Sequence, residues 1–180
     1  MTRAEYFITH FIDSDTPTRT RLEKWPMHFT VIPPFVINEP SNEEMVVDLM
    51  AREGRAIGPI DLSADSSIDA GVLILVPGKV DKFGPEEKPD EMIEAVKLND
   101  PTTKLYRLHR QLLKSLVTIH CEYTNLNPEW SGKNYNPHVT LKSGRKLAWP
   151  FVATTLSLSK KDAEGKSVVA TVDMYNQTRL

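Results

Sequence analysis

Two short segments of this sequence repeat one pattern of histidine and threonine. The first reads HFTV at residues 28–31, and the second reads HVTL at residues 138–141. Side chains of a strand alternate between its two faces, so the histidine and threonine of each segment share one face, about 7 Å apart. The apolar residues point the other way. Each segment therefore predicts a strand that is anchored in the core and offers an imidazole and a hydroxyl on its other side.

These residue types suit acid–base chemistry on a phosphodiester. One imidazole, that of His28 or His138, can act as general base while the other protonates the leaving oxygen, because histidine titrates close to neutral pH. The hydroxyls of Thr30 and Thr140 can donate hydrogen bonds to the non-bridging phosphate oxygens. This arrangement needs neither a metal nor a cofactor.

The spacing alone is a weak signal, and its context strengthens it. A proline precedes each histidine by one or two positions, at Pro26 and Pro137, and both hydroxyl residues are threonine. Two predicted helices separate the copies. These shared features favour a matched pair of site strands over two unrelated polar strand faces.

With these motifs the sequence resembles the two-histidine phosphoesterase superfamily, which includes 2′-5′ RNA ligase-like proteins and cyclic phosphodiesterases. The resemblance assigns His28 and His138 to catalysis, and Thr30 and Thr140 to phosphate binding. It implies a bilobal α+β fold of mainly antiparallel sheets, with pseudo-twofold symmetry around a central cleft. It also implies metal-independent hydrolysis, or reversible ligation, at 2′,3′-cyclic or 2′-5′ phosphate linkages of RNA ends or small nucleotides.

Four further residues are candidates for the border of that cleft. His10 lies on the predicted first strand, Trp25 and Tyr135 flank the motif strands and could stack on a base, and Lys142 could meet phosphate. Ordinary packing, or solvated surface charge for the lysine, is the competing interpretation of each. His109, beside the leucine stripe of the second helix, is expected at the boundary of the core.

The predicted elements mix strands and helices without a strict alternation, which favours a mainly antiparallel α+β fold. Strands are expected at residues 6–13, 28–37 with a break at Pro33 and Pro34, 60–62, 71–76 and 136–142, and a hairpin at 151–159 and 167–174. A helix follows the capping-box pattern at 41–44, and a second begins at Asp100 and Pro101. Residues 77–100, polar and rich in proline, are expected to form a loop insertion.

Length and composition bound the remaining possibilities. With 180 residues the chain is expected to form a single domain of two lobes over 1–180. A formal net charge of −2 argues against a duplex-DNA surface, and no apolar run is long enough for a membrane span. The single cysteine, Cys121, and the lack of an export signal favour a cytoplasmic protein. A monomer is the expectation.

Two other functions remain open at this point. A zinc hydrolase could use both histidines, but neither motif has a second histidine, cysteine or carboxylate at ligand spacing. A catalytically silent RNA-binding or nucleotide-binding module could keep the same cleft. Turnover of a cyclic nucleotide in the presence of chelator separates these alternatives.

Overall fold

The structure, a computed structural model, describes residues 3–12, 18, 21–39, 42–64, 72–75, 93–119, 131–140 and 150–175. Its helices are α1 (Asn42–Ile57), α2 (Lys104–Thr118) and the short 3-10 helix η2 (Gly132–Asn134). Its strands are β1 (Glu5–Phe11), β2 (Arg21–Leu22), β3 (His28–Phe35), β4 (Ile60–Ala64), β5 (Val72–Leu75), β6 (Ile93–Asn99), β7 (His138–Thr140), β8 (Phe151–Ala153), β9 (Thr155–Asp162) and β10 (Gly165–Asp173).

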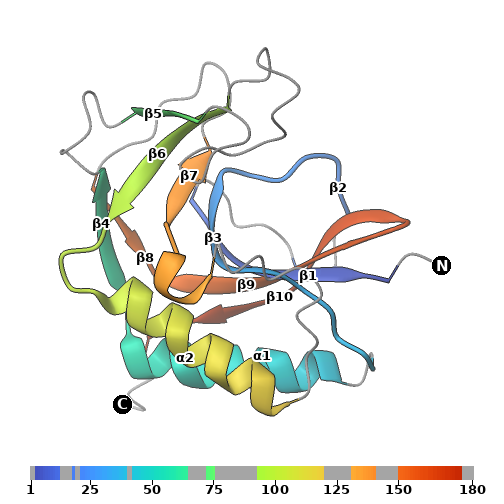
Figure 1. The fold of residues 1–180 in the computed structure, drawn as a ribbon. Coiled ribbons are helices and arrows are strands. Elements are labelled where there is room, and N and C mark those ends of the chain that lie inside the picture. The colour runs from blue at the N-terminus through green and yellow to red at the C-terminus, as the bar shows by residue number, and fades with distance from the viewer. Residues whose placement is uncertain are drawn as a thin grey trace.

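All the described strands belong to one antiparallel sheet. Their order is β2-β10-β9-β1-β3-β7-β6-β4-β8, with β5 paired to β6, and each pairing is antiparallel. The predicted α+β class with mainly antiparallel pairing is therefore confirmed. The strands that carry the two motifs, β3 and β7, are neighbours in the middle of this order (Figure 1).

Helices α1 and α2 pack against each other and on one face of the sheet, which lies above them in Figure 1. Helix α2 contributes a stripe of buried leucines at the predicted helical spacing, namely Leu105, Leu108, Leu112 and Leu116. The sheet contributes buried side chains such as Phe29 of β3 and Val139 of β7 to the same core cluster. Full burial of one such side chain stabilises the fold by about 1.5–3 kcal/mol.

Strand β3 continues through Pro33 and Pro34, where the sequence predicts a break. Proline has no N–H to donate to a ladder. The pairing with β1 accommodates this by a register shift, because Tyr6 pairs with Phe35 whereas Ile8 pairs with Ile32. The two prolines therefore lie at an irregularity of the ladder and do not end the strand.

Strand β6 corrects the prediction of a loop over residues 77–100. Residues 93–99 form a strand that pairs with β5, with β7 and with β4, and residues 77–92 lie outside the described part of the chain. Ala95, Val96 and Leu98 of this strand are buried, whereas Lys97 is half-buried and Asn99 is exposed. Apolar and polar residues therefore alternate only over residues 96–99, and so short a run inside a polar segment is a weak signal for a strand.

Helix α2 begins at Lys104, three positions after the predicted start at Pro101. The chain first makes a turn in which Thr103 adopts a left-handed conformation with φ of 57°. Thr103 occupies the N-cap position, where Asp100 was predicted, and its side chain makes no capping hydrogen bond. The carboxylate of Asp100 accepts hydrogen bonds from the backbone N–H groups of Thr102 at 3.1 Å and Leu105 at 2.6 Å, so it still satisfies one N–H of the first turn.

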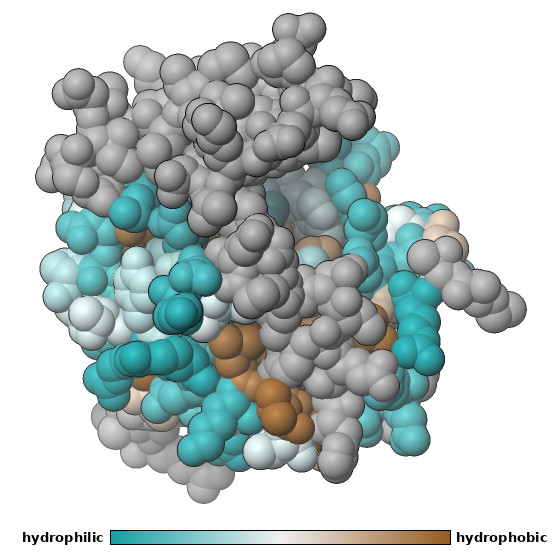
Figure 2. Space-filling model, in the orientation of Figure 1, coloured by the Kyte–Doolittle hydropathy of each residue, from teal (hydrophilic) through white to brown (hydrophobic). Residues whose placement is uncertain are grey.

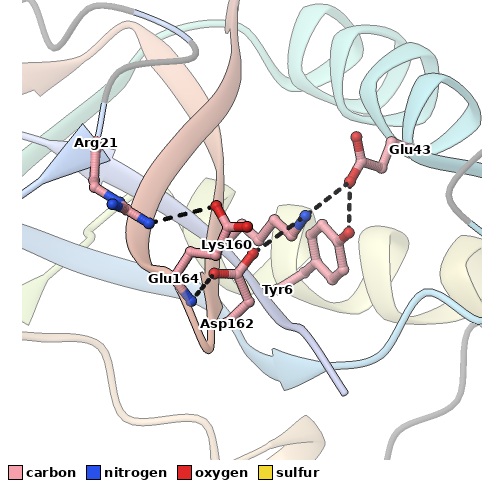
Figure 3. A network of polar contacts seen from close by, with 6 residues as sticks. All are labelled: Tyr6, Arg21, Glu43, Lys160, Asp162 and Glu164. Carbon is pink, nitrogen blue, oxygen red and sulfur yellow. Dashed lines mark hydrogen bonds and ion pairs between the residues drawn. The ribbon is translucent and has the colours of Figure 1, made fainter. Parts of the chain in front are cut away.

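A polar network ties α1 to the hairpin between β9 and β10 (Figure 3). The hydroxyl of Tyr6 donates to the carboxylate of Glu43, and the ammonium of Lys160 lies 3.9 Å from Glu43 and 3.4 Å from Asp162. Burial, followed by the bond to Glu43, raises the pKa of Tyr6. This network lies near the start of β1, whereas the other end of β1 pairs with His28.

The described surface is mostly hydrophilic in the view of Figure 2. Its exposed large hydrophobic residues are scattered over different elements: Met45 on α1, Val117 on α2, Val152 on β8 and Tyr175 after β10. Within the described residues, neither helix is both long and apolar enough to cross a bilayer.

Candidate active site

The two motifs lie side by side on neighbouring antiparallel strands. Phe29 of β3 pairs with Val139 of β7, and both side chains are buried in the core. Because side chains alternate along each strand, the neighbours of these two residues project from the opposite face of the sheet. That face carries the four predicted site residues, His28, Thr30, His138 and Thr140, and we call it the motif face.

The strand register places the histidine of each motif opposite the threonine of the other motif. In an antiparallel pair centred on Phe29 and Val139, His28 lies opposite Thr140, and Thr30 lies opposite His138. A local twofold relation therefore connects the two strands. Each imidazole has the hydroxyl of its own strand two residues along and the hydroxyl of the other strand directly across, which is the arrangement needed to surround one small anion.

Both imidazoles are held in the same way. The Nδ1 atom of His28 lies 2.7 Å from the carbonyl oxygen of Pro26, and that of His138 lies 2.9 Å from the carbonyl oxygen of Asn136. A carbonyl oxygen only accepts hydrogen bonds, so Nδ1 of each ring carries the proton and donates it. In the neutral ring Nε2 is then the atom that takes up a proton.

The electrostatic setting favours a neutral ring at His138. Burial lowers its pKa, the bond to the Asn136 carbonyl opposes this, and the charge of His28 lowers the pKa further. The influence of His28 means that the two rings are electrostatically coupled. A pair coupled in this way disfavours the state in which both rings are charged.

The two threonines differ in exposure. Thr30 is half-buried and Thr140 is exposed. No hydrogen bond joins either hydroxyl to another described residue, so both can donate to a bound group. The backbone of Thr30 is fixed, because its carbonyl oxygen accepts a hydrogen bond of 2.9 Å from the hydroxyl of Tyr135.

Trp25 is brought to the motif face beside His28. Its ring centroid lies 6.2 Å from that of His28 and 6.3 Å from that of Phe11, the residue of β1 that pairs with His28. Phe7 meets the same indole edge-on at 6.3 Å. The side chain of Trp25 is half-buried. This cluster offers an aromatic surface next to one of the two imidazoles.

His10 lies behind the site and not on the motif face. It pairs with Phe29, so its side chain points to the core, where it is buried and its ring contacts Phe29 and Phe151. Its Nδ1 bonds the carbonyl oxygen of Thr155 at 2.9 Å. Burial lowers its pKa, against the effect of that hydrogen bond. The placement excludes a position of His10 at the border of the cleft and agrees with the alternative of ordinary packing. The sequence left both open because it did not show which face of the first strand is buried.

Tyr135 is also buried, which agrees with the alternative of ordinary packing and not with a ring that stacks on a base. Its ring stacks on that of His109, with centroids 3.9 Å apart and an interplanar angle of 3°. Lys142, the remaining candidate, lies outside the described residues.

His109 is the polar residue that the sequence interpretation underestimated. It is fully buried and not at the boundary of the core. Its Nδ1 donates to the carbonyl oxygen of Val31 at 2.7 Å, and its Nε2 accepts from the N–H of Gly132 at 2.9 Å. Burial is the main reason that its pKa is lowered. Sequence spacing gives no signal for these partners, since both are backbone groups far away along the chain.

No group of three or more histidine, cysteine, aspartate or glutamate side chains in the described residues has the geometry of a metal site. The chemistry that the motif face offers is that of two imidazoles and two hydroxyls. With a large antiparallel sheet and the paired His-x-Thr strands at its centre, the molecule falls in the class of two-histidine phosphoesterase folds.

Comparison with known proteins supports this class. The family model of the 2′-5′ RNA ligase superfamily matches residues 7–179. The chain therefore belongs to the 2′-5′ RNA ligase superfamily. Membership supports an enzyme of phosphoesterase type. A comparison with curated proteins finds no match.

Solved structures share the fold at low sequence identity. The protein TT0787 of Thermus thermophilus aligns with a TM-score of 0.58 and 12% identity, over 96% of this chain and 99% of its own. LigT of E. coli complexed with 3′-AMP gives a TM-score of 0.56 and 12% identity, over 97% of this chain and 100% of its own. A structure described as a phosphoesterase aligns with a TM-score of 0.55 and 13% identity, over 97% of this chain and 100% of its own.

Proposed function

We propose that this protein is a metal-independent phosphoesterase that hydrolyses 2′,3′-cyclic phosphate or 2′-5′ phosphodiester linkages of RNA ends or small nucleotides. The observation that carries the proposal is the matched setting of His28 and His138. Each ring donates Nδ1–H to the carbonyl two residues before it, and the two motifs are joined by the pairing of Phe29 with Val139. The complex of LigT with 3′-AMP supports a nucleotide as the class of substrate.

In this mechanism His138 is the general base and His28 the general acid. Burial and the charge of His28 favour the neutral ring at His138, which can take a proton from water at Nε2. The oxygen of that water forms a bond to phosphorus, and the bond from phosphorus to the 2′ or 3′ oxygen breaks. Protonated His28 gives its proton to the leaving oxygen, which becomes the free hydroxyl of the product.

Thr30 and Thr140 bind the non-bridging oxygens in this proposal. Since each lies across from the histidine of the other strand, their hydroxyls can reach the phosphate from two sides. Negative charge on these oxygens is stabilised by hydrogen-bond donors that are already in position. In the same proposal the ring of Trp25, which is half-buried beside His28, stacks on the base of the nucleotide.

The decisive experiment measures products from 2′,3′-cyclic nucleotides and from a 2′-5′-linked dinucleotide in excess chelator. The wild type is compared with His28→Asn and His138→Asn, because the asparagine amide can still donate to the nearby carbonyl but carries no titrating nitrogen. Turnover with chelator that is lost in both variants supports the proposal. Turnover that returns only with added zinc contradicts it, and so does nucleotide binding by the wild type without turnover, the result expected of a silent binding module.

A further inference from the structure

Within the described residues, the ladder between β3 and β7 is short, and at the start of β7 a proline explains why it ends. The two strands pair at Phe29 and Val139, and β7 begins at His138. Pro137, which comes just before, has no N–H to continue the ladder. The relative position of the two histidine strands therefore depends on other contacts beyond this point.

Side chains supply the next two donors to β3. Tyr135 donates its hydroxyl to the carbonyl of Thr30 at 2.9 Å, and His109 donates Nδ1–H to the carbonyl of Val31 at 2.7 Å. These are consecutive residues of the strand that begins with His28. Tyr135 is also only three positions before His138, so its hydroxyl links the approach to the second motif directly to the first.

His109 extends the connection to a third element. Its Nε2 accepts the N–H of Gly132, the first residue of η2, at 2.9 Å. Gly132 has a φ of 61°, a conformation that favours glycine and fixes the turn leading toward His138. His109 thus fastens α2, β3 and η2 together, and its ring lies flat on Tyr135.

The directions of these hydrogen bonds are fixed by chemistry. The carbonyl of Val31 can only accept and the N–H of Gly132 can only donate, so His109 must carry its proton on Nδ1 and remain neutral. Its full burial also favours the neutral ring. Because both nitrogens of His109 have hydrogen-bond partners in a packed interior, the ring is held in one orientation and can keep the strands in register.

We propose that His109 and Tyr135 are positioning residues, which hold the strand of His138 in place against the strand of His28 and so align the two imidazoles. The activity part of this inference rests on the proposed function. Neither residue touches the reacting atoms. Their effect passes through the backbone carbonyls of Thr30 and Val31.

Tyr135→Phe is the first test because it removes one hydroxyl and keeps the ring that stacks on His109. Misalignment of reacting groups by about 1 Å can cost ~10²-fold in rate, so loosening one of these contacts is expected to lower kcat by about 10-fold. The matched control is Tyr6→Phe, which removes a hydroxyl bonded to Glu43 near the other end of β1. It should lower the melting temperature comparably and leave kcat unchanged.

His109→Asn and His109→Leu form a second pair. Asparagine can keep a donor near the position of Nδ1, whereas leucine removes both hydrogen bonds. If His109 positions the strands, kcat follows the order wild type, His109→Asn, His109→Leu. Equal kcat in the two variants, or the reverse order, contradicts the inference. If the leucine variant does not fold, Tyr135→Phe decides the question.

A second measurement does not depend on turnover. The ring-nitrogen NMR shifts of His28 and His138 are followed against pH in the wild type, in Tyr135→Phe and in Tyr6→Phe. Because the two rings are coupled, a change in their separation moves the titration of His138 in Tyr135→Phe only. If the wild type cleaves no cyclic nucleotide, the proposed function fails while this shift still supports the positioning role. If Tyr135→Phe matches Tyr6→Phe in both titration and kcat, the positioning role is overturned.

Discussion

Stability should fall as the pH drops below 6.5, and the cause lies in buried histidines. His10, His109 and His138 have pKa values lowered from 6.5, chiefly by burial. In the unfolded chain each takes up a proton near pH 6.5, whereas in the folded protein each stays neutral to a lower pH. The unfolded state therefore binds more protons in this window, so its free energy falls relative to the folded state.

The size of the effect follows from the number of protons. One proton bound only by the unfolded state changes the free energy of unfolding by at most about 1.4 kcal/mol per pH unit, so His10, His109 and His138 each contribute no more than this to the slope. His109→Gln should make the slope smaller by the contribution of His109. At about pH 7.5 the same variant should be less stable by about 1–3 kcal/mol, because the buried carbonyl of Val31 and the N–H of Gly132 lose the imidazole as their hydrogen-bond partner.

Urea unfolding followed by tryptophan fluorescence, at several pH values between about 5 and 8, measures both quantities. Tyr6→Phe is a suitable control, since it loses a hydrogen bond without losing a group that titrates in this range. It should be destabilised by a similar amount at every pH. A slope in His109→Gln equal to that of the wild type would refute the reasoning, because it would mean that His109 is already protonated in the folded state.

Further outcomes concern the site and one helix cap. His28→Ala and His138→Ala should each lower kcat by about 10²- to 10⁴-fold, measured with a 2′,3′-cyclic nucleotide, because each removes a positioned acid or base; near-normal activity would exclude that residue from the mechanism. Thr30→Ala and Thr140→Ala should each raise the activation free energy by about 1–3 kcal/mol through a lost phosphate bond, with Ser variants milder, and wild-type kcat/KM in both Ala variants would place the phosphate elsewhere. The pH–rate profile should be bell-shaped in excess chelator, since one neutral and one charged imidazole are needed, and a monotonic profile would contradict this. Asp100→Ala should lower the free energy of unfolding by about 0.5–2 kcal/mol in urea titrations, because the N–H of Leu105 in the first turn of α2 loses its acceptor, and an unchanged midpoint would argue against this role.

The motif strands were predictable because their information is local. Alternation along four residues places a histidine and a threonine on one face, and the structure places both motifs in that way. The fold class followed from the order of strands and helices. The sequence did not predict the position of His10, because alternation divides the side chains of a strand between two faces without showing which face the helices cover.

His109 and Tyr135 mark what the sequence could not supply. Histidine on the apolar side of a helix usually indicates a boundary position, and only the tertiary structure provides the backbone groups of Val31 and Gly132 that satisfy its two nitrogens. Strand β6 was missed because its apolar and polar residues alternate only over residues 96–99, and the strands that pair with it are known only from the tertiary structure.

The place of β1 in the sheet bears on how the chain folds during synthesis. One edge of β1 pairs with β3 soon after both have been made, but its other edge pairs with β9, which begins at Thr155. Until that strand leaves the ribosome, the polar backbone edge of β1 has no partner from β9, and exposed edges of this kind recruit other chains. The pairing of β1 with β9 also joins residues that are distant in sequence, and such contacts form slowly. We therefore expect chaperones to bind most to nascent chains that have not yet been extended past Thr155.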